Sequence, residues 1–392
     1  MILQIPHKEI IERQSVFKSR LSSNGIEGCI LFSTTDIFYL TNFMFRPSER
    51  PIAFFIDPQN ETHLFVPSLE HSHAITYATI DHVHSYPEYP GEIHPMIVLR
   101  NILKTYKLNN TTVGLDAQGY SSPKGYNGAA ITDLLEFKKS IDIKGWVEKQ
   151  RYIKSENEIE LIKESARWGN LAHQLLVEHS KAGSREMEIE GHATMEATQA
   201  MFKTLGEGYK PYGNPAHAFY RGQIGPHSAF PHSQNQNAEL KKGFNVVSQA
   251  ACDVWGYKSE LERTMFIEEA DSRQEQYFRY MYEAQEVAFR TIKPGVEASK
   301  IEIEVQAYFK DNGLEELSRH HTGHNMGLLN HEAPFFDLGD HTVLEPGMVF
   351  SVEPGLYIDG LGAFRHSDTI VVTESGMEMI TYYPRDFESL II

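Results

Sequence analysis

Cysteine is almost missing from this sequence of 392 residues, which contains only Cys29 and Cys252. Two cysteines so far apart provide neither a disulfide framework nor a cysteine-based zinc site. Long apolar runs are missing too, because no stretch reaches the roughly 18 residues that a membrane-spanning helix needs. The N-terminus lacks the basic start and apolar segment of a secretion signal. These absences predict a cytoplasmic protein with no membrane partner.

Positive charge is scarce as well. The 36 Lys and Arg residues stand against 53 Asp and Glu residues, so the formal net charge is −17. Nucleic-acid binding relies on a basic face that releases counterions from phosphates, and this balance therefore disfavours a nucleic-acid partner. Hydrophobic content of 41% and charged content of 23% are those of a globular protein. The acidity is explained by solubility, or by carboxylates that converge on a cationic substrate or a metal.

The pattern of apolar residues divides the chain into two parts. Residues 28–33 and 51–57 read as buried strands, and strands alternate with helical patterns to about residue 145, which is typical of a small α/β domain. We therefore predict a first domain at 1–148 and a second, larger domain at 149–392.

Capping boxes predict where two helices of the second part begin. Ser155 with Glu158 opens a long helix, and Ser272 with Glu275 opens another. Strand-like runs that carry polar residues follow these helices. The second domain is therefore predicted to be α+β.

Carboxylates and histidines concentrate in three segments of the second domain. Glu260 and Glu262 are two residues apart, so their side chains would share one face of a strand, either in a cavity or along a solvated edge. Glu353 ends an apolar run, where a buried carboxylate needs a partner. Two glycines, Gly323 and Gly327, allow close backbone approach inside a segment with four histidines: His320, His321, His324 and His331.

Five motifs now point to a family. They are Pro-His at 232, Gly-Tyr-x-x-acid-x-x-Arg-Thr at 256–264, Gly-His…His-Glu at 323–332, LEPGM-x-x-S-x-EPG at 344–355 and GAFRHSD at 362–368. In this order they resemble the creatinase, prolidase and aminopeptidase P superfamily, which implies a C-terminal pita-bread domain. The first 145 residues resemble the smaller α/β N-terminal domain of creatinase and prolidase. The resemblance also implies a homodimer.

The resemblance transfers the metal ligands of the family's peptidases residue by residue. Those enzymes bind two divalent metals through two aspartates, one histidine and two glutamates. The corresponding positions here are Gln249, Glu260, His324, Glu353 and Ser367. Because Gln249 and Ser367 replace usual ligands, a two-metal site is disfavoured. One metal held by Glu260, His324 and Glu353 would still have three protein ligands and room for water.

Creatinase, which works without metal, suggests a second interpretation. By this resemblance, Glu262 and Glu353 bind a cationic C–N group and His232 is the acid/base that moves a proton to the leaving nitrogen. His324 and His331 would complete the catalytic set, lining the same cavity.

Two further residues would bind substrate. Arg50 matches a creatinase arginine that holds the substrate carboxylate, in its own or in a neighbouring subunit's site, or else forms an ordinary surface ion pair. Glu260 adds a carboxylate where creatinase has a small apolar residue.

Three hypotheses follow. The preferred one is a creatinase-like, metal-independent hydrolase of a C–N bond in a small cationic, guanidino or amide compound, with no cofactor. The alternative is an Xaa-Pro dipeptidase or aminopeptidase-P-like peptidase that acts on a dipeptide with one divalent metal (Mn, Co or Zn). A second alternative is a catalytically silent binding protein.

Overall fold

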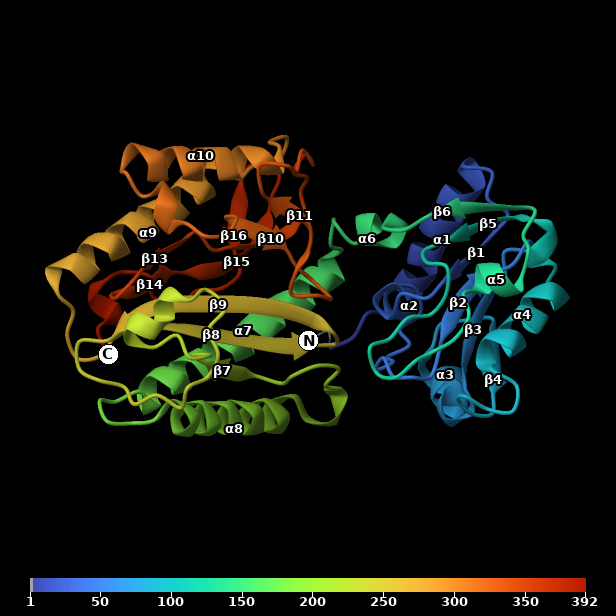
Figure 1. Cartoon of the computed structure of the whole chain (residues 1–392), viewed down its shortest axis with the longest axis horizontal. Helices are drawn as coiled ribbons and strands as arrows, with labels where there is room; N and C mark the ends of the chain where they lie inside the picture. The colour runs from blue at the N-terminus through green and yellow to red at the C-terminus, as the bar shows by residue number, and fades with distance from the viewer. Residues whose placement is uncertain (1–2) are drawn as a thin grey trace. The chain divides into compact units, whose positions relative to one another are not determined.

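The computed structural model describes residues 3–392, which form two compact units (Figure 1). The smaller unit is Ile5–Gln150, and the larger comprises Arg151–Ile392 with the described residues before Ile5. Mixed helix and sheet in the larger unit and an α/β arrangement in the smaller one confirm the predicted fold class. Over residues 3–392, no helix is both long and apolar enough to cross a membrane.

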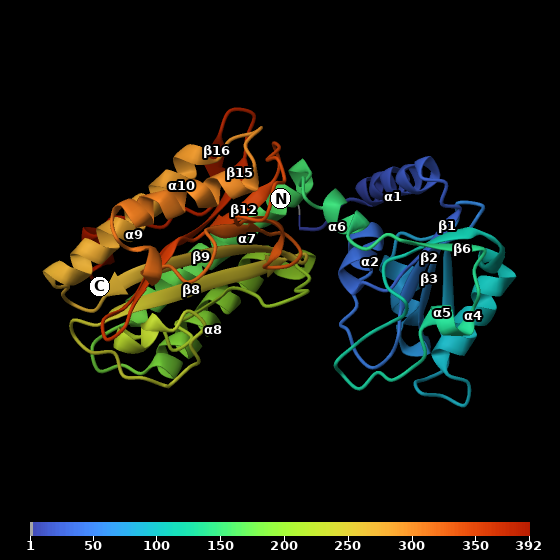
Figure 2. The ribbon, with the colours of Figure 1, turned by 45° about the horizontal axis from the view of Figure 1, so that its top comes forward.

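The smaller unit is built on one six-stranded sheet, which Figure 2 shows with its helices around it. The strand order is β4-β3-β2-β1-β5-β6, with β2 antiparallel to β1 and β3 and the other pairs parallel. The strands are β1 Gly28–Leu31, β2 Ala53–Ile56, β3 Thr62–Pro67, β4 His82–Tyr86, β5 Thr112–Leu115 and β6 Lys139–Asp142. The helices are α1 His7–Ser23, α2 Thr34–Thr41, α3 His71–Tyr77, α4 Pro95–Thr105, α5 Ile131–Leu134 and α6 Trp146–Gln150. Strands β1 to β3 are buried along their whole length, as expected of short apolar strands inside a covered sheet.

Four helices cover the sheet of the larger unit: α7 Glu156–His179, α8 Glu186–Leu205, α9 Ser272–Thr291 and α10 Ala298–Asp311. Helix α7 packs on β8 (Asn245–Val254) and β9 (Tyr257–Phe266), and α8 packs beside it (Figure 1). The capping box of Ser155 and Glu158 is present at the start of α7. The second predicted box is wrong by one residue: Asp271 and Gln274 form it, because the Asp271 carboxylate accepts the Gln274 N–H and Ser272 is already helical.

The large sheet of this unit has eight strands, in the order β11-β10-β12-β15-β9-β8-β7 with β16 paired to β15. A separate hairpin joins β13 and β14. The strands are β7 His217–Phe219, β8 Asn245–Val254, β9 Tyr257–Phe266, β10 Gly323–Asn325, β11 Glu332–Phe336, β12 Val349–Val352, β13 Gly355–Ile358, β14 Gly362–Arg365, β15 Ser367–Val372 and β16 Met377–Met379.

Strand register brings the predicted site residues together. In the β8–β9 hairpin, Gln249 pairs with Glu262, and Glu260 lies two residues further along the same face. Strand β15 then places Ser367 opposite Glu262. One sheet thus gathers residues that are more than a hundred positions apart in the chain.

Candidate metal and active site

Glu260, His324 and Glu353 form a compact group of possible metal ligands. Glu260 lies on β9, His324 on β10, and Glu353 directly follows β12. One donor atom of each residue lies within 4.8 Å of the other two. His324 is fully buried, whereas both carboxylates are partly exposed. Two oxygen donors and one nitrogen donor therefore surround a point that solvent can reach.

The ring of His324 is oriented by its own strand. Its Nδ1 lies 3.2 Å from the carbonyl oxygen of Asn325, so the Nδ1–H donates to this carbonyl. Its Nε2 is buried, lies 3.2 Å from Glu353 Oε1 and has no aligned hydrogen-bond partner. Metal-binding histidines are commonly held this way, with one ring nitrogen bound to a carbonyl and the other facing the ion. The donor set fits a divalent cation.

The carboxylates of Glu260 and Glu353 also favour a positive charge between them. Burial alone would lower the pKa of His324, but Glu353 and Glu260 raise it to about 9. Burial likewise opposes ionisation of Glu353, and the neighbouring His324 and Arg365 hold its pKa well below the usual range. The group is electrostatically suited to a cation, and a proton on His324 supplies that charge when no metal competes.

Ser367 holds Glu260 by a hydrogen bond. The hydroxyls of Ser351 and Ser367 each lie 2.8 Å from Glu260 Oε1 and are donors to it. The two hydroxyls are 2.6 Å apart. Ser367, which was predicted to replace a carboxylate ligand of the family's peptidases, therefore donates to Glu260.

Glu262 is not one of the three grouped donors and pairs with Arg365. Arg365 Nη2 donates to Glu262 Oε1 at 2.8 Å, its Nε pairs with Oε2, and the Gln249 amide also donates to Oε1. Burial raises the pKa of Glu262 to about 7 against the opposing charge of Arg365. A substrate cation, as predicted for Glu262, would have to displace the guanidinium of Arg365.

Arg365 is a residue of this site that was not predicted from the sequence. Arg365 Nη1 donates to the hydroxyl of Tyr357 at 3.0 Å, and Nη2 lies 3.3 Å from Gln223 Oε1. Its Nε is 3.9 Å from Glu353 Oε2, so the guanidinium links Glu262 with Glu353. The sequence did contain a cue for this residue, since Arg365 belongs to the GAFRHSD motif.

Two other predicted histidines lie at the exposed side of the site. The ring of His331 stacks on that of His324 with centroids 4.1 Å apart and an angle of 20° between the planes. The pKa of His331 is lowered, first by burial and then by His324, with a contribution from His232. His232 itself is exposed in the loop before β8. The structure thus brings His324, His331 and His232 to one region.

A buried network behind β10 supports His324. Lys154 donates to the side-chain oxygen of Asn325 and lies 3.8 Å from Glu332 Oε2. Burial lowers the pKa of Lys154 to about 8. Gly323 is required here, because a Cβ at this residue would lie 2.1 Å from the carbonyl oxygen of Ser351. No pattern in the sequence marked Lys154.

Arg50 belongs to the smaller unit. Its Nε lies 2.7 Å from Glu88 Oε1, and its Nη1 pairs with Glu49. These ion pairs raise its pKa. Binding of a substrate carboxylate by Arg50 stays a prediction.

Fold and site together define a two-domain hydrolase whose C-terminal domain has the pita-bread fold, as predicted. The family model described as metallopeptidase family M24 matches residues 160–374, and that of the creatinase/prolidase N-terminal domain matches 13–153. The chain belongs to metallopeptidase family M24.

Relatives match over nearly the full length. An Xaa-Pro dipeptidase of Pyrococcus furiosus is 26% identical over 382 residues, covering 97% of this chain and 99% of the relative. A putative dipeptidase of Bacillus subtilis is 24% identical, covering 94% and 97%. The solved Xaa-Pro dipeptidase of Bacillus anthracis superposes with a TM-score of 0.80 at 25% identity, covering 97% of this chain and 99% of that one.

These findings correct two predictions. The prediction that the protein needs no cofactor is wrong, because the chain belongs to a family of metallopeptidases. The preferred creatinase-like hydrolase is not supported, and the relatives agree better with the peptidase alternative. A hydrolase of the peptidase class is supported, which also disfavours the silent binding protein.

Proposed function

We propose that this protein is a metal-dependent peptidase that hydrolyses dipeptides with proline in the second position, using one divalent cation per chain. The observation that carries the proposal is the group of Glu260, His324 and Glu353, whose donor atoms lie within 4.8 Å of one another. The substrate class is that of the Xaa-Pro dipeptidases, which match this chain over nearly its full length.

A single cation follows from the donors around the site. A second ion would need Gln249 and Ser367, which offer an amide and a hydroxyl where carboxylates would offset the repulsion between two cations. Both are already hydrogen-bond donors, Gln249 to Glu262 and Ser367 to Glu260. Three protein ligands with an open position are a workable catalytic arrangement for manganese, cobalt or zinc.

Each step of the proposed reaction has a candidate residue. The cation would polarise the scissile carbonyl and lower the pKa of a bound water. His331, stacked on His324 at the exposed side, would donate to the developing oxyanion. His232 would return a proton to the secondary amine of the leaving proline. Arg365 would help His324 to keep Glu353 ionised, since its Nε lies 3.9 Å from Glu353 Oε2.

The test combines metal analysis with turnover. Protein stripped by a chelator is dialysed against manganese, cobalt or zinc, its metal content is measured, and hydrolysis of Xaa-Pro dipeptides is compared with that of matched Xaa-Ala dipeptides. We expect one ion per chain, activity only with metal and a preference for proline. Full activity of the stripped protein, or turnover of guanidino compounds in place of peptides, would overturn the proposal.

Matched variants locate the ion. His324→Ala and Glu353→Gln should lose both metal and activity while circular dichroism stays unchanged. His341→Ala and Glu345→Gln remove the same kinds of side chain from exposed positions and should keep both. Metal content that survives in the first pair would contradict the assignment of the ligands.

A further inference from the structure

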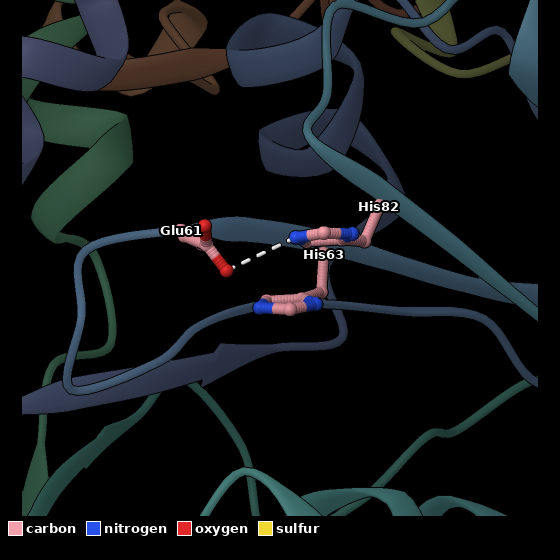
Figure 3. A group of neighbouring side chains, drawn as sticks. All are labelled: Glu61, His63 and His82. Atoms are coloured by element: carbon pink, nitrogen blue, oxygen red, sulfur yellow. Dashed lines mark hydrogen bonds and ion pairs between the residues drawn. The ribbon is translucent and has the colours of Figure 1, made fainter.

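A second group of metal-ligand side chains lies in the smaller unit. One donor atom each of Glu61, His63 and His82 lies within 4.8 Å of the other two. His63 is on β3, His82 opens the edge strand β4, and Glu61 is in the turn that precedes β3. Figure 3 shows the Glu61 carboxylate beside one nitrogen of each ring, so that the three donors face the same side.

Strand register produces this group. Strands β3 and β4 are parallel with His63 directly opposite His82, and the two rings stack with centroids 4.7 Å apart. Antiparallel β2 places Phe55 opposite His63 on the other flank, with centroids 4.3 Å apart. Tyr106 and His84 also lie against His63, with ring centroids 4.3 and 5.3 Å away. Aromatic neighbours therefore hold His63 in place on β3, the strand next to the edge strand β4.

One ring nitrogen of the buried histidine lacks a hydrogen-bond partner, whereas the other, Nδ1, lies 3.1 Å from His84 Nε2. The side chain of His63 is 0% exposed, and its Nε2 is a buried polar atom without an aligned hydrogen bond, although Asp57 Oδ2 lies 3.4 Å away. A buried ring nitrogen left in this way costs free energy unless a ligand completes it. Burial lowers the pKa of His63, while the nearby Asp57 opposes this shift.

The other two donors can adjust. The side chains of His82 and Glu61 are 40% and 51% exposed, and His82 Nε2 lies 3.0 Å from Glu61 Oε2. Since stacked rings do not aim both lone pairs at one point, binding requires His82 to turn about its side-chain torsions, which its exposure permits. One fixed imidazole and two movable ligands at the surface make a site that an ion can enter from solvent.

From this geometry we infer that Glu61, His63 and His82 bind a divalent transition-metal ion of the zinc type. Two imidazoles and one carboxylate are the ligands that zinc prefers, with water or Asp57 left to complete the coordination. The ion would tie the β2–β3 turn to edge strand β4 and so stabilise the smaller unit. This site is independent of the proposed function, because all its ligands belong to residues 5–150.

The test uses the full chain with the other metal site removed. In the His324→Ala/Glu353→Gln background, stripped protein is titrated with zinc by calorimetry, and bound zinc is counted after dialysis. We expect one zinc per chain and a melting temperature of the smaller unit that rises with zinc concentration. Cobalt should bind with the visible absorption of a tetrahedral site.

Exposed ligands give variants that still fold. Glu61→Gln and His82→Asn should each weaken zinc binding by roughly tenfold or more, the scale of loss seen when a metal site is disturbed, and abolish the thermal shift. Glu70→Gln and His73→Asn break a similar surface pair of the same unit, with Glu70 Oε2 2.8 Å from His73 Nδ1, and should leave both unchanged. No bound zinc in the background protein, or equal affinity in all four variants, would overturn the inference and leave Glu61 and His82 as an ordinary surface ion pair.

Discussion

Arg365 holds Glu262 in a buried two-point ion pair. Nη2 donates to Oε1 at 2.8 Å while Nε faces Oε2, and the two residues are 3% and 1% exposed. They come from β14 and β9, and β15 brings them together by pairing with β9. The pair fills the part of the site where a substrate cation was expected, and it keeps a cation next to Glu353 whether or not a metal is bound.

Removing one partner of this pair should cost more than removing both. Arg365→Met leaves the Glu262 carboxylate buried beside Glu353, and we expect a loss of about 3–5 kcal/mol in the free energy of unfolding. The double variant Arg365→Met/Glu262→Gln should recover most of that loss, because no unpaired charge remains. Urea unfolding followed by tryptophan fluorescence measures both variants.

The control for this comparison is a surface pair. Arg290 and Glu283 are 59% and 44% exposed, so Arg290→Met should change the free energy of unfolding by less than about 1 kcal/mol. A double variant at Arg365 and Glu262 that is no more stable than the single one would contradict the role assigned to the charge.

Restoring two carboxylates should restore a second metal. Gln249→Asp together with Ser367→Glu places the missing ligand types beside Glu260, and we expect the manganese content to rise from one to two ions per chain. Elemental analysis after dialysis measures the change, with Gln236→Asp/Ser389→Glu adding the same charges at exposed positions as the control. One ion per chain in the rebuilt protein would show that something other than these two residues limits the site.

Acid should destabilise the larger unit through His173. This histidine is fully buried, its Nε2 is 2.6 Å from Ser248 Oγ, and burial lowers its pKa to about 3. In the unfolded chain His173 binds a proton at about pH 6.5, whereas in the folded chain it does not. Its contribution to the free energy of unfolding is therefore fully present above about pH 6.5 and is lost as the pH falls toward 3. The loss from this group approaches about 1.4 kcal/mol per pH unit inside that window.

A variant that cannot titrate isolates the effect. His173→Gln keeps a donor for Ser248, and its free energy of unfolding should depend less on pH between about 6.5 and 4. Exposed His341→Gln should leave the slope unchanged. Equal slopes for His173→Gln and the parent protein would contradict this prediction.

The candidate site residues that the sequence suggests are marked by local cues. Glu260 lies two residues from Glu262 in a strand, and the histidine segment around Gly323 is dense and contiguous. The start of α7 was predicted from Ser155 and Glu158 for the same reason. At α9 the sequence pattern fitted Ser272 as the N-cap, but the neighbouring Asp271 has this role. The cofactor prediction failed because it gave two replaced ligands more weight than the three that remain.

By itself, the sequence determined the family, the two-part α+β architecture and the residue types that can hold a cation, since motifs and periodicity are properties of neighbouring residues. Only the tertiary structure decided which charges meet. Glu262 pairs with Arg365, 103 residues away, and His63 stacks on His82 across a parallel strand pair. Such pairings depend on strand order and register, which are set by packing of the whole sheet and leave no local trace in the chain.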